Sequence, residues 1–334
     1  MQSNLIVEAM LKPETYPESV GKIELIQTHI SFVFLTDKFV YKIKKPVNFG
    51  FLDFSTLEKR HVCCGKELQL NRRLCPWIYL EVVPLNMSDK LRIGGAGETV
   101  EYAVKMLRLP QERLMSQLLQ KNQVNEKTID AIAAIVAKFH SEAQCSLEID
   151  AFGGLGVVRT NWTENFVQTQ KYIGQTLSQV DYDFIQQRIT RFMDLNSSLF
   201  EQRVADGRIR DCHGDLYSSN IFVTDQICIF DAIEFNDRFR YSDVASDVAF
   251  LAMDLDYQNR SVLSDHFINQ YTRYSGDAQL ALMLPFYKCY RAYVRGKVVS
   301  FRLDDQNIAV SDKVAAVKEA SAYFELAAKY AHSL

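Results

Sequence analysis

The residues with the clearest potential for chemistry lie between His213 and Asp231. His213, Gly214 and Asp215 follow one another, and Asn220 stands five residues after the aspartate. A loop carboxylate such as Asp215 can orient a hydroxyl nucleophile and accept its proton. An amide oxygen from Asn220 and a carboxylate from Asp231 are ligands that suit Mg²⁺, which leaves coordination positions for water and phosphate.

Two apolar runs between Asn220 and Asp231 predict a β-hairpin with its turn at Asp225-Gln226. A two-residue turn there would place Asn220 directly opposite Asp231, with their Cβ atoms about 5 Å apart. A base and a pair of metal ligands are together what phosphoryl transfer requires of a protein. The segment therefore predicts a phosphoryl-transfer site.

A purely structural explanation has to be weighed against this one. Aspartate and asparagine are common turn residues, so the His-Gly-Asp sequence is also compatible with an ordinary tight bend. The complete pattern would arise by chance on the order of once in a thousand sequences of this composition. The hairpin that ends in Asp231 makes chance agreement rarer still, so we prefer the functional interpretation.

Length and composition narrow the class of protein. The chain has 334 residues, enough for two hydrophobic cores, and it is 48% hydrophobic and 24% charged, as ordinary globular proteins are. A formal net charge of -3 gives no electrostatic reason to expect nucleic acid or an anionic membrane as partner. The sequence has neither the run of about 18 apolar residues that a membrane helix needs nor a signal-peptide pattern. Its seven cysteines contain no Cys-x-x-Cys pair, so we expect no disulfide framework, no zinc site and a cytoplasmic location.

The chain changes character near Pro110. Before it, one helix is expected from Ser55, which has capping-box spacing to Glu58, to about Leu74. The same part of the chain has strand signals over 23–29, 32–35, 39–44, 79–85 and 101–107. After Pro110, apart from a strand-like segment over 208–231, apolar periodicity predicts helices over about 129–139, 182–204, 243–254, 261–273, 278–303 and 311–331. Such a plan would place a ligand site in a cleft between two lobes.

The segment from His213 to Asn220, with Asp231 after the hairpin, resembles the catalytic and metal-binding signature of the aminoglycoside phosphotransferase family. That family includes choline-kinase-like enzymes, and the order of elements supports the resemblance over nearly the whole chain. It implies an α+β, protein-kinase-like two-lobed fold. A nucleotide-binding lobe would span 1–108, and a catalytic and acceptor-binding lobe would span 109–334.

A kinase of this type needs a lysine on a strand of the small lobe to hold the nucleotide phosphates. In the predicted strand 39–44, Val40, Lys42 and Lys44 share one face, and the residue two positions before the lysine should cover the adenine. Val40 suits that place ahead of Lys42, whereas the choice of Lys44 would put Lys42 over the base. Lys42 is therefore the expected ligand, and substitution of Lys44 or Lys45 should be mild. The alternative is that all three are solvated lysines on an edge strand.

The partner of Lys42 is expected on the helix that begins near Ser55. Glu67 lies in the apolar stripe of that helix, with Cys64 and Leu70 three residues away on either side. An inward-facing carboxylate needs a cationic partner, since an unpaired buried charge is costly. We prefer a Glu67–Lys42 pair over a plain surface glutamate.

The nucleotide loop departs from the protein-kinase pattern, because residues 28–31 contain no glycine. The hydroxyl of Ser31 is a candidate phosphate contact, although Ser31 could equally be an ordinary turn residue. The resemblance implies that backbone groups from Met106 to Arg108, at the lobe connection, bind the adenine edge.

Three residues are expected to support the site rather than to react. His213 would hold the loop through a side-chain hydrogen bond, and Asp243 and Asp247 resemble the family's acidic residue at the start of a helix beneath the catalytic loop. A helix N-cap is the ordinary alternative for both aspartates. A stripe of cations at helical spacing is either a solvated face or a surface that suits an anionic acceptor: Lys288, Arg291 and Arg295.

The sequence thus predicts an ATP- and Mg²⁺-dependent phosphotransferase that acts on a hydroxyl group of a small molecule. Asp215 would be the base, Asn220 and Asp231 the Mg²⁺ ligands, Lys42 the phosphate ligand and Glu67 its partner. The alternatives are a protein Ser/Thr kinase of the same fold and a catalytically silent nucleotide-binding switch. The segments 28–35 and 229–237 look most like an uncharacterised bacterial subgroup, and they specify neither the acceptor nor the oligomeric state.

Overall fold

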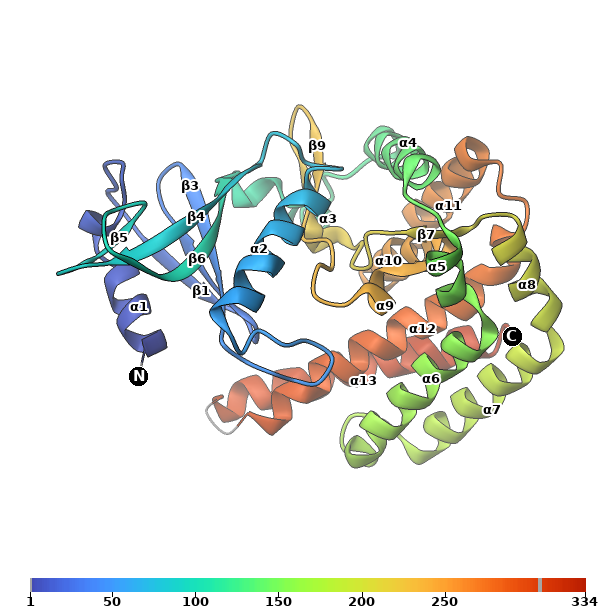
Figure 1. Cartoon of the computed structure of the whole chain (residues 1–334). Helices are drawn as coiled ribbons and strands as arrows, with labels where there is room; N and C mark the ends of the chain where they lie inside the picture. Colours follow the sequence, from blue (N-terminus) through green and yellow to red (C-terminus); the bar gives the residue numbers. More distant parts are fainter. Residues whose placement is uncertain (1, 306–307) are drawn as a thin grey trace. The chain divides into compact units, whose positions relative to one another are not determined.

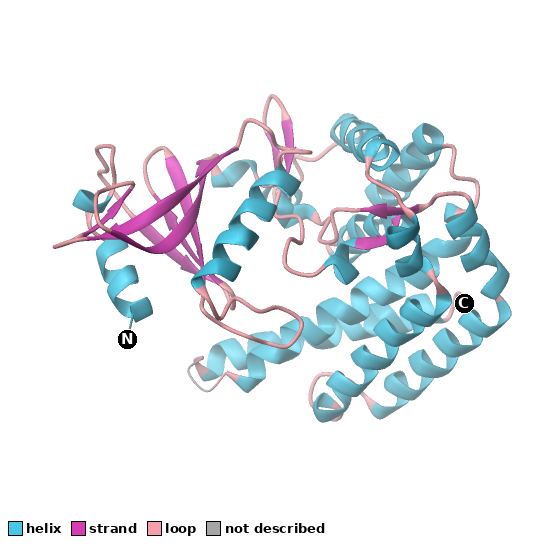
Figure 2. Cartoon of the chain, in the orientation of Figure 1, coloured by secondary structure: helices cyan, strands magenta, loops and turns pink. Residues whose placement is uncertain are grey.

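The computed structural model describes residues 2–305 and 308–334, and the chain divides into two compact units (Figures 1 and 2). The first unit is the chain up to Gln117 together with Ser219–Asp237, and the second is Leu118–Ser218 together with Arg238–Leu334. The hairpin segment therefore belongs to the same unit as the N-terminal strands. A division into functional lobes at residue 108 stays a prediction.

An antiparallel sheet, magenta in Figure 2, forms the centre of the first unit. It has six strands in the order β1-β2-β3-β6-β4-β5. Runs of β-branched and aromatic residues form these strands because such side chains pack well on a pleated surface. Each predicted strand is present, with ends that differ by a few residues. The strands are β1 (Glu24–Gln27), β2 (Ser31–Leu35), β3 (Phe39–Lys44), β4 (Tyr79–Met87), β5 (Leu91–Ile93) and β6 (Glu98–Leu107).

The two faces of the sheet carry different residues, as the alternation along β3 predicts. Tyr41 and Ile43 are buried in an apolar cluster with Met10 of helix α1 (Gln2–Met10). The alternate residues of β3 point to the other face, where helix α2 (Leu57–Asn71) packs against β4 and β6 (Figure 1). Strand β3 thus presents its lysines to α2 and its large apolar side chains to α1.

Helix α2 begins one residue later than the predicted capping box requires. Its N-cap is Thr56, whose hydroxyl accepts a hydrogen bond from the Lys59 amide at 3.2 Å. Ser55 instead donates its hydroxyl to Asp53 at 2.6 Å. The capping box of Ser55 and Glu58 is therefore wrong by one position, although the helix is where the pattern places it.

The predicted hairpin exists, but its register is shifted by one residue. Strands β8 (Ile221–Val223) and β9 (Ile227–Ile229) pair Ile221 with Ile229, around a loop of three residues rather than two. In that loop the Thr224 hydroxyl donates to the Gln226 carbonyl at 2.6 Å. Nothing in the sequence favours a three-residue loop over the predicted two-residue turn.

As a result, Asn220 lies opposite Phe230 rather than Asp231. The Phe230 amide donates to the Asn220 carbonyl at 3.0 Å. Asp231 follows beyond the ladder in the left-handed region, with φ of 65°. The direct cross-strand pairing of Asn220 and Asp231 is thus a wrong prediction, because the three-residue loop shifts the register by one residue.

The second unit is mainly helical and contains a two-stranded sheet of β7 (Ile209–Asp211) and β10 (Tyr241–Asp243). The helices that follow strand β6 along the chain are α3 (Met115–Gln120), α4 (Glu126–Glu142), α5 (Leu147–Asp150), α6 (Leu155–Thr169), α7 (Gln179–Leu195), α8 (Ser197–Ala205), α9 (Asp237–Arg240), α10 (Val244–Tyr257), α11 (Ser261–Ser275), α12 (Leu280–Ser300) and α13 (Val310–Ala331). The predicted helix over 182–204 is divided at Asn196. The sequence patterns do not predict helices α1, α3, α5, α6 and α9. No helix in the described ranges is long and apolar enough to cross a membrane.

A buried arginine fixes the start of α10 in the second unit. Arg203 is 1% exposed and donates two hydrogen bonds to Asp243, at 2.8 and 2.6 Å, and one to Asp277 at 2.6 Å. Asp243 in turn caps α10 by accepting from the Ala245 amide at 2.8 Å. The helix that carries Asp247 is therefore anchored at its first residue.

We predict that Arg203→Met lowers the free energy of unfolding by about 3–5 kcal/mol, because it leaves two buried carboxylates without their cation. Urea denaturation followed by circular dichroism measures this change. Arg191→Met removes an exposed arginine from α7 and should change stability by no more than about 0.5 kcal/mol. Equal stability of the two variants would contradict the anchoring role of Arg203.

Candidate active site

A cluster of two lysines and three carboxylates lies within the first unit. Lys42 Nζ is 2.9 Å from Glu67 Oε1 and 2.6 Å from Asp231 Oδ1. Lys44 Nζ is 2.7 Å from Glu67 Oε2 and also pairs with Glu234. Each oxygen of the Glu67 carboxylate therefore holds a different lysine, so one helix residue connects both lysines of β3.

Burial makes these pairs strongly interdependent. Glu67 is fully buried, Lys44 is 1% exposed and Glu234 is 4% exposed. Burial alone would lower the pKa of Lys42, but Asp231 and Glu67 outweigh it and hold that pKa well above its ordinary value. Burial would raise the pKa of Glu67, but Lys42 and Lys44 lower it below its usual range. Both lysines and Glu67 are thus charged at neutral pH.

Sequence reasoning placed Lys42 and Glu67 on facing elements but missed the second pair. Lys44 was expected to be a tolerant position, whereas it is a buried cation between Glu67 and Glu234. Burial raises the pKa of Glu234 above its ordinary value, although Lys44 opposes that shift. The available signal was the shared face of Lys42 and Lys44, which requires both lysines to find carboxylates.

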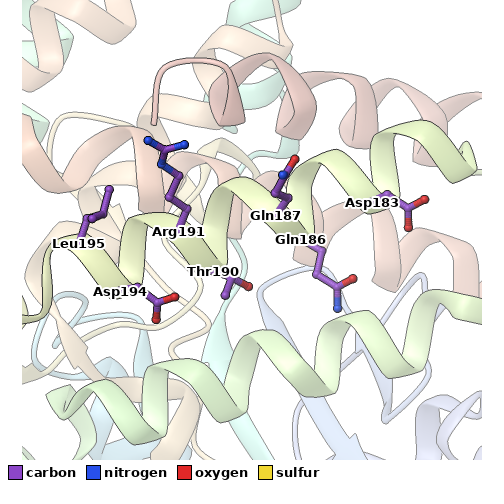
Figure 3. Close-up of a pocket in the computed structure, with 7 residues that line it drawn as sticks. All are labelled: Asp183, Gln186, Gln187, Thr190, Arg191, Asp194 and Leu195. Carbon is purple, nitrogen blue, oxygen red and sulfur yellow. The ribbon is translucent and has the colours of Figure 1, made fainter.

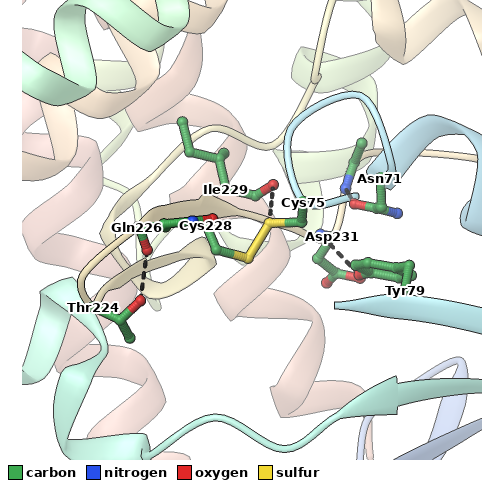
Figure 4. Close-up of a disulfide and its surroundings, with 9 residues drawn as sticks. Asn71, Cys75, Tyr79, Thr224, Gln226, Cys228, Ile229 and Asp231 are labelled. Atoms are coloured by element: carbon green, nitrogen blue, oxygen red, sulfur yellow. Dashed lines mark hydrogen bonds between the residues drawn. A yellow bond between two sulfur atoms is a disulfide. The ribbon is translucent and has the colours of Figure 1, made fainter. Parts of the chain in front are cut away.

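The chain around Asp231 is fixed to α2 and β4 of the same unit (Figure 4). The Asp231 amide donates to the Tyr79 hydroxyl at 3.3 Å, and the Ala232 amide donates to Asn71 Oδ1 at 2.9 Å. Burial, with the nearby Glu67 and Asp231, raises the pKa of Tyr79 well above its ordinary value, so its hydroxyl stays neutral. These bonds hold the left-handed turn that aims Asp231 at Lys42.

A disulfide between Cys75 and Cys228 joins the segment that follows α2 to strand β9 (Figure 4). No sequence motif predicts this bond, since the two cysteines are 153 positions apart and match no spacing motif. The expectation of no disulfide is therefore corrected. The bond lies three residues before Asp231, so it fixes the same strand that leads into the ionic cluster.

The oxygen donors of this unit suit a divalent cation. Asp231 has a side chain that is 41% exposed, and in the described part of the chain its carboxylate is bonded only to Lys42, through Oδ1. With all groups ionised, Lys42 and Lys44 face three carboxylates, so the cluster has one negative charge in excess. Asn220 is 5% exposed at the head of the hairpin. The accessible oxygen of Asp231 and the surplus negative charge of the cluster both suit Mg²⁺, which binds few protein oxygens.

The residues predicted to contact the nucleotide differ in their packing, burial and hydrogen bonds. Val40 pairs with Met106 across β3 and β6, and both contribute to one apolar cluster of the first unit. The amide of Arg108 donates to the Lys38 carbonyl at 2.9 Å, so an adenine contact there would have to use carbonyl groups. Ser31 is fully buried, and its hydroxyl has no hydrogen-bond partner in the described chain. A phosphate contact by Ser31 stays a prediction that this burial does not favour.

In the second unit, Asp247 holds the loop that carries Asp215. The carboxylate of Asp247 accepts from the His213 amide at 2.7 Å and from the Gly214 amide at 2.9 Å. His213 Nδ1 accepts from the Asp215 amide at 3.2 Å. Burial would raise the pKa of Asp247, but His140, His213 and Arg291 lower it strongly. An ionised carboxylate beneath the loop thus fixes its backbone.

The cationic stripe of α12 faces inward rather than toward solvent. Lys288 pairs with Asp256 at 2.8 Å, and Arg291 donates to the Gly214 carbonyl at 2.9 Å. The Arg295 guanidinium lies over the Tyr217 ring at 5.0 Å. Burial would lower the pKa of Arg295, but Tyr323, Tyr217 and Asp215 raise it. The interpretation as a solvated face is therefore wrong, and two of the three cations support the loop.

Two other features of the second unit lie outside the predicted site: a group of possible metal ligands and a surface hollow. His140, Cys212 and Asp247 could offer ligand atoms within 4.8 Å of one another, but the His140 nitrogens already bond Tyr271 and Asp247. A hollow of about 580 Å³ on α7 is lined by Arg191, Asp183 and Asp194, together with uncharged residues (Figure 3). It contains no residue of the predicted site.

Solved structures show the same fold. The GDP complex of aminoglycoside 2'-phosphotransferase-IIIa matches with a TM-score of 0.56 and 14% identity, over 96% of this chain and 99% of that one. A choline/ethanolamine kinase family protein from Mesorhizobium loti matches with a TM-score of 0.55 and 11% identity, over 99% of this chain and all of that one. The predicted α+β, protein-kinase-like fold is therefore confirmed, and so is the likeness to these phosphotransferases at the level of fold.

Sequence relatives are mycobacterial. The chain is 36% identical over 281 residues to the uncharacterized proteins Rv2004c of Mycobacterium tuberculosis and Mb2027c of Mycobacterium bovis. The alignment covers 84% of this chain and 55% of each relative, so the chain spans about half the length of the curated relatives it matches. No protein-family model matches the chain.

We predict that Lys44→Met destabilises the protein more than Lys42→Met does. Without Lys44, the buried Glu234 loses its cation, which should lower the free energy of unfolding by about 3–5 kcal/mol. Without Lys42, Glu67 keeps Lys44 and Asp231 is accessible to water, so the loss should be about 1 kcal/mol. Urea denaturation measures both changes, with Lys45→Met as the control. A Lys44 variant as stable as the Lys45 variant would contradict the buried cluster.

We also predict that Asp247→Asn loosens the loop that carries Asp215. Hydrogen bonds to charged groups are worth about 1.5–3 kcal/mol, so exchange of the His213 and Gly214 amides should become about ten to a hundred times faster. Hydrogen exchange resolved to single residues measures this. Asp256→Asn is the control, because Asp256 bonds Lys288 and Tyr330 instead of the loop. Unchanged exchange at His213 and Gly214 would refute the role of Asp247.

Proposed function

We propose that this chain is an ATP- and Mg²⁺-dependent phosphotransferase that transfers the γ-phosphoryl group of ATP to a hydroxyl group of a small molecule. The observation that carries the proposal is the double contact of Lys42 with Glu67 and Asp231. A strand lysine paired with a helix glutamate, beside a carboxylate that can bind metal, is the arrangement that positions nucleotide phosphates in protein-kinase-like enzymes.

Each proposed role follows from the chemistry of its residue. Lys42 would hold the nucleotide phosphates, and Glu67 would keep its ammonium group in place. Asn220 and Asp231 would hold Mg²⁺, which neutralises charge on the phosphates when it is bound. Asp215 would orient the acceptor hydroxyl and take its proton. Transfer then needs little covalent participation by the protein, since positioning and electrostatic stabilisation lower the barrier.

A nucleotide and a small-molecule acceptor are both supported by likeness of fold. The aminoglycoside phosphotransferase of the same fold was solved with GDP, and the other match belongs to the choline/ethanolamine kinases. We propose ATP as the phosphoryl donor and a metabolite hydroxyl as the acceptor. Phosphorylation of protein Ser or Thr is the second candidate, and a silent nucleotide-binding switch is the third. Acceptor-dependent ADP release, screened over sugars, amino alcohols, nucleosides and aminoglycosides, separates the three.

Two substitutions should separate the base from the metal ligand. Asp215→Asn removes the proton acceptor, so turnover should fall by about 10²- to 10⁴-fold while nucleotide binding persists. Asp231→Asn removes the anionic Mg²⁺ ligand, so Mg²⁺-dependent nucleotide affinity should fall together with turnover, and raised Mg²⁺ should recover part of the loss. Calorimetric titration with a non-hydrolysable ATP analogue at low and high Mg²⁺, beside a turnover assay, measures both effects.

The opposite pattern would reverse these assignments. If the Asp215 variant loses Mg²⁺-dependent binding while the Asp231 variant keeps it, the roles are exchanged. If both variants keep full turnover, the His-Gly-Asp segment is a structural turn and the phosphotransferase proposal fails.

A further inference from the structure

The second unit contains a cavity that the proposed phosphoryl-transfer chemistry does not use. Its volume is about 390 Å³, and it lies among the second half of α4, the turn between α8 and β7, the start of α10 and the end of α11. Small-molecule sites have volumes of about 300–1,000 Å³, so the cavity is large enough for a metabolite. Each lining residue belongs to the second unit.

The cavity is lined by more positive than negative charge. Lys138, Arg208 and Arg210 contribute cations, and Asp206 contributes the one carboxylate among the described lining residues. The Asp206 carboxylate already accepts a hydrogen bond from the side-chain amide of Gln202 at 2.7 Å. Neighbouring cations repel one another, so the cavity would be stabilised by an anion.

Arg208 is the least explained of these cations. Its Nε is shielded from solvent and has no hydrogen-bond partner within the described residues. Its backbone is fixed, because its amide donates to the Arg203 carbonyl at 2.9 Å and its carbonyl accepts from the Val244 amide at 3.0 Å. A buried polar group without a partner costs about 1–3 kcal/mol. A small rotation of the Arg208 side chain toward an oxyanion in the cavity would give its Nε an acceptor.

Arg210 is held in position beside it. Its Nε donates to the Gly207 carbonyl at 2.8 Å, and its Nη1 donates to the Ala143 carbonyl at 3.1 Å. Gly207 has φ of 64°, a left-handed conformation that ends α8 and turns the chain toward β7. Arg208 from the turn and Arg210 from the adjoining strand β7 thus both line the cavity, and guanidinium groups match phosphate oxygens in geometry.

The cavity also reaches the loop that carries Asp215 through two hydrogen-bonded residues. His140 lines it, is 4% exposed, and has Nε2 at 3.3 Å from Asp247 Oδ2. Asp247 accepts the amide hydrogen bonds of His213 and Gly214. A ligand that shifts His140 would therefore change the support of that loop.

We propose that this cavity binds a small phosphate-bearing ligand through Arg208 and Arg210, and that its occupancy alters the order of the His213–Ser218 loop through His140 and Asp247. The proposed binding site does not depend on the proposed phosphotransferase activity, since none of its contacts involves a nucleotide or an acceptor.

Pyrophosphate is the probe that tests the binding site in the full chain, with Mg²⁺ removed by chelation. Calorimetry should give saturable binding with a dissociation constant below about 1 mM, equivalent to about 4 kcal/mol. Arg208→Met and Arg210→Met should each weaken it about tenfold or more, because each removes a charge-assisted contact. Arg208→Lys, which keeps the charge without the fork, should lie between wild type and Arg208→Met. Arg191→Met removes an arginine from the other hollow and should leave the affinity unchanged.

Hydrogen exchange tests the connection to the loop. Pyrophosphate should change the exchange rate of the His213–Ser218 amides in the wild-type chain and in Arg191→Met, but not in Arg208→Met. In the part of the chain that the structure describes, the Arg208 guanidinium makes no hydrogen bond, and its Nε is buried without a partner. Arg208→Met should therefore unfold at a temperature no lower than that of the wild type.

Four outcomes would overturn the proposal. Absence of saturable binding refutes the site, and binding that survives both arginine substitutions places pyrophosphate elsewhere. Equal affinity for citrate with the same dependence on Arg208 shows that the site selects carboxylates rather than phosphate. Binding without any change in loop exchange removes the connection to His140. None of these outcomes depends on turnover, so failure here is distinguishable from failure of the proposed function.

Discussion

The buried carboxylate of Glu67 is the constraint on which the first unit depends. It has no access to water, and it is stable as an anion only because Lys42 and Lys44 approach it from the same strand. That requirement fixes the register of β3 against α2, because a one-residue slip would turn both lysines to the opposite face. Breaking such a buried pair on one side costs several kcal/mol, so the geometry is far better determined than an exposed ion pair would be.

The second unit also depends on a buried carboxylate, that of Asp247, whose partners are backbone amides rather than lysines. A loop rich in small and polar residues has backbone amides that need acceptors when they are buried. Asp247 supplies both acceptor oxygens from the first turn of α10, and Arg203 with Asp243 fixes the start of that helix. The catalytic candidate Asp215 therefore sits on backbone that is held by a buried anion.

The sequence was informative where one physical requirement decides the answer. Strand alternation gave the face of Lys42, and helix periodicity gave the inward direction of Glu67. It failed where competing local choices have similar energies, as in the two- or three-residue turn after Val223 and the cap at Ser55 or Thr56. It could not give the Cys75–Cys228 bond or the Lys44–Glu234 pair, because each joins residues far apart along the chain. Such contacts depend on the fold as a whole.

The chain passes between the two compact units three times, after Gln117, after Ser218 and after Asp237. The Cys75–Cys228 bond closes a covalent ring that contains the first two of these passages and all of Leu118–Ser218. Consequently, while the bond is intact, one backbone cut between Cys75 and Cys228 would open the ring without separating the molecule into pieces. The first half of the helical unit is thus tethered at both of its ends, and the segment that bears Asp231 stays attached to α2 even in a nicked chain.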